Sequence, residues 1–125
     1  MIKLIFLILI LTCSISFANE RLRGYQALEQ KDYKLAFKSF KFSALWQHPM
    51  SRLMLGNMYY QGQGVAVSYP KTFLWWRLAE DLNIDGARQN INMIEEKMSK
   101  DEYNEGYTLY SNCMKSISYI CTKNR

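Results

Sequence analysis

The chain repeats its own pattern of large and small side chains at an offset of 36 residues. Four pairs of positions carry the pattern: Tyr33 and Tyr69, Phe37 and Phe73, Phe40 and Trp76, and Ser43 and Ala79. Within each copy the spacings are three and four residues, which place the four side chains on one face of a helix. A repeat of this length is typical of a helix–turn–helix unit. No useful stretch alternates with the period of a strand, so we predict an all-α fold of stacked helix pairs.

Proline and capping residues mark the ends of the expected helices. Pro49 and Pro70 each lie near the start of a helix, where the missing N–H group is tolerated. Ser68 is a suitable N-cap, and Ser99–Glu102 has the Ser-x-x-Glu form of a capping box. We therefore expect six helices in three antiparallel pairs, which are residues 20–30 with 33–46, 49–61 with 69–82, and 86–98 with 100–116.

One glycine and two tryptophans indicate how the central pair packs. Gly56 lies inside the expected helix 49–61, where glycine is about 1 kcal/mol less favourable than alanine. We expect that close approach of the partner helix requires it. Trp76 shares a helix face with Phe73, so we expect Trp76 in the core. Trp75 is turned by ~100° around the helix axis, and we expect it to tolerate substitution better.

The first 18 residues have the form of a secretory signal peptide. Lys3 precedes an apolar run, Leu4–Leu11, and the segment ends in Ser-Phe-Ala, which is a small-x-small cleavage pattern. We expect cleavage after Ala18 and a mature chain in the periplasm or outside the cell. The apolar run is too short to cross a hydrocarbon core of ~30 Å comfortably, so we expect no stable membrane span after processing. Lipid attachment at Cys13 is the alternative.

The mature chain is mildly basic. Removing Lys3 leaves 15 Lys and Arg residues against 11 Asp and Glu, a net charge of +4. The regular series of cations is Lys31, Lys34, Lys38 and Lys41, whose spacing predicts a solvated stripe on one helix. An exported chain rarely meets nucleic acid, so we expect no nucleic-acid partner. An acidic partner surface or an anionic membrane leaflet remains open as a use for the stripe.

Two cysteines remain after cleavage, Cys113 and Cys121, and an oxidising compartment favours a disulfide between them. In one continuous helix they would lie about 12 Å apart, whereas a disulfide needs Cα atoms within about 7 Å. We therefore expect the last helix to end between them and the tail, residues 117–125, to fold back over its apolar face. Two cysteines and the single His48 do not supply four zinc ligands, so we predict no metal site, and His48 is expected at a helix boundary.

The middle of the chain carries a denser pattern. The stretch "LGNMYYQGQGVAVSYPKTFLWWRLAEDLNIDGA", residues 55–87, resembles one complete repeat of the Sel-one-like family, the relatives of the tetratricopeptide repeat. The positions that match the family pattern are Leu55, Gly56, Tyr59, Gly62, Gly64, Val65, Tyr69, Lys71, Trp76, Ala79 and Ala87. The departures are Ser68 for the usual Asp, Thr72 for Ala, and Gln47 and Asn83 for the turn glycine.

The resemblance implies a division of the chain into repeats. Residues 19–48 would form a pair like an ordinary tetratricopeptide unit, residues 49–85 the Sel-one-like repeat, and residues 86–116 a capping helix pair. Together they would make a short α-solenoid that binds other proteins or peptides without a cofactor. Some short exported members of the family act as immunity proteins against antibacterial effectors.

Solenoids of this kind bind partners on a concave surface lined by the first helix of each pair. Aromatic side chains contribute much of the binding free energy at such surfaces. We name Tyr25, Arg52 and Tyr60 as candidate partner-binding residues, because they lie on expected first helices. Tyr59, at a consensus position of the family, is expected to pack between helices instead.

An enzymatic alternative rests on the sequence Ser-Tyr-Pro-Lys, Ser68 to Lys71, which matches the Ser-x-x-Lys pattern of serine acyl enzymes. One such match is expected by chance in a chain with this many serines and lysines. The companion motifs of those enzymes are missing, and Ser68 and Lys71 already fit a helix start. We therefore predict a binding protein, and keep an envelope hydrolase as the alternative.

Overall fold

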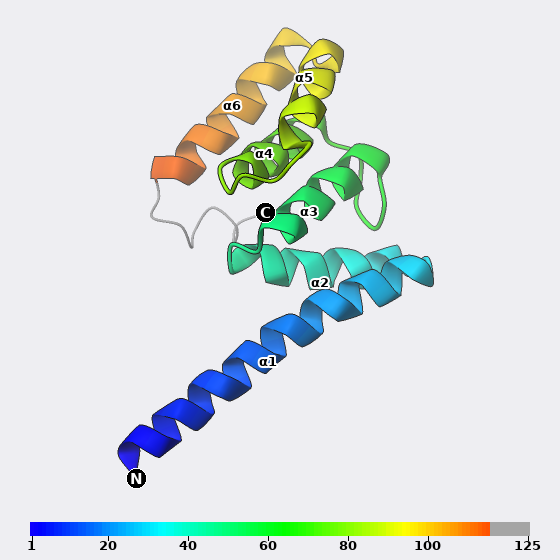
Figure 1. The fold of residues 1–125 in the computed structure, drawn as a ribbon. Helices are drawn as coiled ribbons and strands as arrows, with labels where there is room; N and C mark the ends of the chain where they lie inside the picture. Colours follow the sequence, from blue (N-terminus) through cyan, green and yellow to red (C-terminus); the bar gives the residue numbers. More distant parts are fainter. Residues whose placement is uncertain (116–125) are drawn as a thin grey trace.

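The computed structural model describes the backbone of residues 1–115 and, except for residues 13–18, their side chains. This part of the chain is all-helical, as predicted, and contains no strand. Its six helices are α1 (Ile2–Glu29), α2 (Tyr33–Leu45), α3 (Pro49–Gln61), α4 (Tyr69–Glu80), α5 (Ala87–Lys97) and α6 (Lys100–Lys115), shown in Figure 1. From α2 to α6 each helix begins and ends within two residues of its expected bounds.

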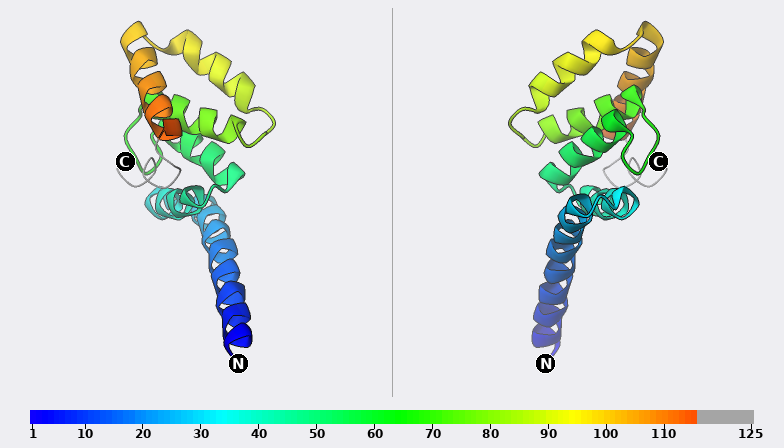
Figure 2. Two further views of the ribbon diagram at one scale, coloured as in Figure 1. Left: turned by 90° about the vertical axis from the view of Figure 1, so that its left-hand side faces the viewer. Right: turned by 90° about the vertical axis from the view of Figure 1, so that its right-hand side faces the viewer.

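Helix α1 is longer than expected, because it runs on from residue 20 back to Ile2 without a break. Its N-terminal half projects away from the other helices (Figures 1 and 2). The apolar side chains of this half are between 54% and 78% exposed, from Ile2 to Leu11. Loss of residues 1–12 would therefore remove no buried side chain, and cleavage after Ala18 stays a prediction. Among the described residues, no helix is both long enough and apolar enough to cross a membrane.

The first four helices pack in chain order, α1 on α2, α2 on α3 and α3 on α4, and both α5 and α6 then pack on α4. The expected third pair is therefore not formed as such: α5 and α6 lie against α4 rather than against each other, and they diverge from the turn between them (Figure 2). Ile91 and Ile94 of α5 pack against Phe73 and Trp76. Helix α6 approaches α4 at Gly106, where an added Cβ would lie 3.1 Å from the Phe73 ring.

Helix α4 is buried on several sides, which overturns the expectation for Trp75. Trp75 and Trp76 are both only 2% exposed. Trp76 belongs to a cluster with Phe73 and the isoleucines of α5. Trp75 belongs to a second cluster that includes Phe40 of α2. Trp75 is turned away from the Trp76 face as predicted, but a different set of helices covers it there.

The expected helix starts are confirmed. The Ser68 hydroxyl accepts a hydrogen bond from the Lys71 backbone N–H at 3.4 Å. Ser99 and Glu102 cap each other's backbone N–H groups, at 3.2 Å and 2.9 Å. These bonds satisfy N–H groups that have no partner inside the helix.

The glycines of the loop between α3 and α4 have separate roles. Gly62 ends α3 with φ at +69°, a left-handed conformation that favours glycine. Gly64 also has a positive φ, and a Cβ there would lie 2.2 Å from the Tyr33 carbonyl oxygen. The loop can therefore lie directly against the first turn of α2. This contact packs the α3–α4 pair against the α1–α2 pair.

The expected close approach at Gly56 is confirmed. A Cβ on Gly56 would lie 2.2 Å from Cδ1 and 2.4 Å from Nε1 of Trp76. The indole N–H donates a hydrogen bond to the Asn57 side-chain oxygen at 3.0 Å. The missing side chain of Gly56 thus makes the space in which the Trp76 ring lies.

Gly56→Ala is expected to destabilise the protein by about 1–3 kcal/mol, because the added methyl group overpacks the Trp76 site. Helix propensity alone would have the opposite effect, because alanine in a helix raises the free energy of unfolding by about 1 kcal/mol relative to glycine. The measurement is the urea midpoint of unfolding. Gly24→Ala is the matched control. Its methyl group would lie 3.0 Å from the Phe40 ring, so it should lower the free energy of unfolding less than Gly56→Ala does. A Gly56→Ala variant as stable as the wild type would contradict this packing.

Candidate functional site

Tyr60 lies where α3, α4 and α5 meet. Its ring stacks on Tyr69 with centroids 6.0 Å apart, and lies 5.7 Å from the Trp76 ring. The Lys97 ammonium of α5 lies 4.9 Å from the centre of the Tyr60 ring and donates a hydrogen bond to its hydroxyl. This hydrogen bond raises the pKa of Lys97 above its ordinary value. Half-buried aromatic rings beside an exposed cation form a surface that suits a peptide with aromatic or acidic side chains.

Tyr25, the second predicted candidate, belongs to the contact between α1 and α2. Its ring meets Phe40 edge-on, with centroids 5.0 Å apart. Burial raises the pKa of its hydroxyl. Tyr25 is half-buried, so its main role in the structure is to pack these two helices. Tyr59 is 3% exposed and packs between helices, which confirms the expectation for that residue.

Arg52, the third candidate, is 6% exposed, so the structure corrects its assignment to a partner-binding surface. Its Nη1 group donates a hydrogen bond to the Leu78 carbonyl at 3.2 Å, and its Nε–H to the Ala44 carbonyl at 3.5 Å. These carbonyls lie in the last turns of α4 and α2, where helical acceptors need other partners. Arg52 therefore joins the ends of two helices.

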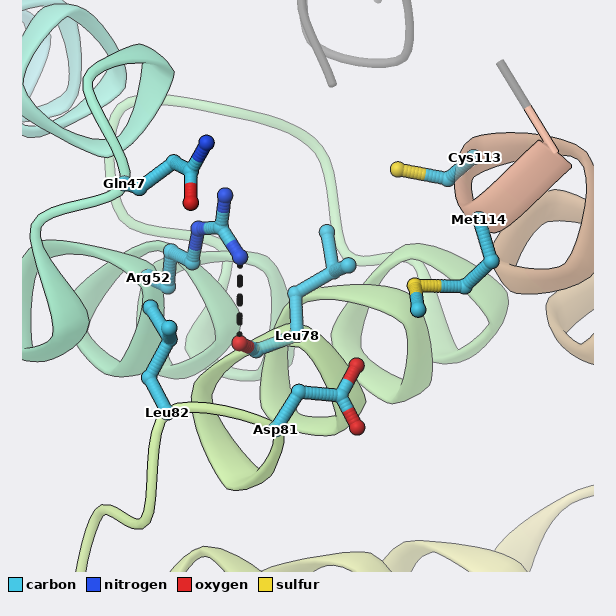
Figure 3. A pocket seen from close by; sticks show the side chains of 7 residues that line it. All are labelled: Gln47, Arg52, Leu78, Asp81, Leu82, Cys113 and Met114. Carbon is cyan, nitrogen blue, oxygen red and sulfur yellow. Dashed lines mark hydrogen bonds between the residues drawn. The ribbon is translucent and has the colours of Figure 1, made fainter. Parts of the chain in front are cut away.

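Arg52 also forms part of the wall of a pocket of about 230 Å³ (Figure 3). The opposite wall comes from α6, and the Asp81 carboxylate at the end of α4 accepts hydrogen bonds from the Tyr110 hydroxyl at 3.0 and 3.1 Å. Burial lowers the pKa of Arg52, and Asp81 opposes this effect. The lining residues are Gln47, Arg52, Leu78, Asp81, Leu82, Cys113 and Met114.

A second hollow of about 390 Å³ lies between α1 and α2, and we call it the α1–α2 groove. Its lining residues are Glu20, Arg23, Lys38, Lys41, Phe42 and Leu45. The lysine series had been expected to form a solvated stripe, and Lys31, Lys34 and Lys38 are indeed exposed. The sequence did not reveal the groove, because Arg23 and Glu20 come from another helix. The sequence feature that could have indicated an anion-binding surface here is the lack of any acidic residue in α2.

The expected disulfide stays a prediction. Cys113 is 5% exposed, in the buried cluster around Trp75. Cys121 and the tail, residues 117–125, lie outside the described residues. Within the part of the chain that is described, no three His, Cys, Asp or Glu residues are grouped closely enough to hold a metal ion.

No protein-family model, curated protein or solved structure matches this chain. The resemblance to the Sel-one-like repeats therefore depends on the matching residues and on the positions of these residues in the packed helices.

His48 caps α3 and connects it to α1. Its Nδ1 atom accepts a hydrogen bond from the Ser51 backbone N–H at 3.3 Å, and Arg21 contacts the other ring nitrogen. Burial lowers the pKa of His48 below the ordinary 6.5, and the Arg21 charge adds to the effect. The neutral imidazole is the form that can accept the capping bond.

The free energy of unfolding should therefore fall as the pH drops below about 6.5, because the unfolded chain then binds a proton that folded His48 resists. His48→Asn keeps a capping side chain and should lose this pH dependence. The measurement is urea unfolding of both proteins from pH 7.5 to 5.5. If the free energy of unfolding changed with pH in the same way for both proteins, His48 would not be the source of the pH dependence.

Proposed function

We propose that this protein is an exported repeat protein of the Sel-one-like type, which binds another protein or a peptide in the cell envelope. The contact surface is the one around Tyr60, with Tyr69 and Lys97 beside it. A short α-solenoid is the proposed arrangement, and binding needs no cofactor.

The observation that carries this proposal is the contact between Tyr60 and Lys97 across α3 and α5. In a repeat protein these would be the first helices of successive pairs, which line the binding surface. Two residues at family-like positions support the proposal by their packing: Gly56 accommodates Trp76, and Gly62 ends α3. A toxin from a competing cell is the specific partner that the resemblance suggests.

The alternative function, an envelope hydrolase of the Ser-x-x-Lys type, has weaker support. The Ser68 hydroxyl caps α4. The Lys71 ammonium lies 5.5 Å from the centre of the Tyr59 ring. Both side chains have packing or capping positions, and catalysis would have to displace them. We therefore propose a binding protein and not an enzyme.

A photo-crosslinking phenylalanine analogue at position 60, in the tagged full chain in its own cells, should give a protein adduct on irradiation. The same analogue at Tyr107 of α6, which is 54% exposed, is the matched control. Mass spectrometry then identifies the partner, and the N-terminal peptide in the same sample shows whether the chain begins at Asn19. Equal adducts from both positions, or none from position 60, would contradict the proposed surface.

A further inference from the structure

We propose that the α1–α2 groove is a second binding surface, which docks the protein on an anionic phospholipid membrane. This surface is distinct in its residues and helices from the one around Tyr60, and lipid docking does not depend on a protein partner. The headgroup phosphates would lie in the groove among Arg23, Lys38 and Lys41, which line it together with the apolar Phe42 and Leu45.

Two of the three cations that line the groove, Lys38 and Lys41, are not neutralised by any described residue. Glu20 is the acidic residue among the lining side chains. One of its oxygens already accepts a hydrogen bond from the Ser39 hydroxyl at 2.8 Å, and the other lies 3.9 Å from Arg23. Lys38 and Lys41 form no ion pair with any described residue. The groove therefore has a positive charge that an external anion can balance.

The charge of residues 19–115 is divided in the same sense. Residues 19–61 contain seven Lys and Arg against three Asp and Glu, a net +4. Residues 62–115 contain six against eight, a net −2. An anionic surface would therefore attract the α1–α2 end of the molecule more strongly than the α5–α6 end, which orients the protein before contact.

Exposed apolar side chains occur on the same two helix segments as the groove residues, in or close to them in sequence. Leu22, next to Arg23, is 54% exposed, and Phe42 is 41% exposed. Trp46, one helical turn after Phe42, is 55% exposed. Tryptophan and phenylalanine beside lysine and arginine are the side chains that enter the membrane–water interface, where the rings reach the acyl boundary and the cations stay at the headgroups.

The composition favours lipid over protein as the occupant. The cores of protein interfaces are depleted in lysine, whereas clusters of lysine and arginine typically bind anionic lipid. The groove also lies on the same helix as the exposed apolar run that ends at Leu11, which is about 14 Å from Glu20 along α1. Contact of that run with lipid before cleavage would bring the groove to the headgroups.

The test uses the protein purified with the N-terminus that its cells leave on it, and vesicles of phosphatidylcholine with and without phosphatidylglycerol. Binding should require phosphatidylglycerol and weaken as salt is added. Lys38→Gln with Lys41→Gln should lower the partition constant roughly thirtyfold, at the strength expected for two cations near an anionic surface. Lys31→Gln with Lys34→Gln removes the same charge outside the groove. This control should lower the partition constant far less than the Lys38 and Lys41 variant does.

Trp46 provides an independent readout, because the other two tryptophans, Trp75 and Trp76, are buried. Its emission should shift to shorter wavelength on phosphatidylglycerol vesicles, and Trp46→Phe should abolish the shift. Equal binding to both vesicle types, or equal losses in the two double lysine variants, would overturn the proposal. It would also be overturned if vesicle binding were unchanged in the Lys38 and Lys41 variant while a co-purifying acidic protein was lost.

Discussion

The contact between Gly56 and Trp76 determines how the central helices pack, and the rest of the fold depends on it. Without a side chain at Gly56, α3 can lie against the indole ring, and Asn57 accepts the indole N–H. The ring then contributes to the cluster shared with α5. Tyr60, one turn after Gly56 along α3, lies on Trp76 and Tyr69. The proposed partner surface is therefore built directly on the core contact.

The molecule has two surfaces of different chemistry. The one around Tyr60 is aromatic with a single cation above it, and its rings are held by α4. The α1–α2 groove combines three cations with apolar side chains on a helix pair whose net charge is positive. With both surfaces, the protein would bind its partner while it stays at a membrane surface, if it is in the envelope as we propose. Arg52 takes part in neither, since its hydrogen bonds join the ends of α2 and α4.

Local chemistry was sufficient to predict most helix bounds, because caps such as Ser68 and Ser99 act on their own neighbours. The close helix approach at Gly56 was predictable from a glycine inside a helix, and the burial of Trp76 from the repeat. Trp75 was misjudged because a periodic pattern assumes that a helix has one exposed face, whereas α4 is covered on several sides. Arg52 and the groove depend on contacts between distant segments, such as Arg52 with Leu78, which no local pattern records. The placement of α5 and α6 on α4 likewise depends on tertiary packing.

Helix α4 contributes to both buried clusters, and we expect it to join them into one cooperative unit. Native-state hydrogen exchange tests this most directly, because it reports the free energy of opening for each segment. We expect the amides of residues 73–79 to exchange last, with the free energy of global unfolding, and those of Ile2–Leu11 to exchange first. Exchange of α4 ahead of α2 and α3 would show instead that the two clusters open independently.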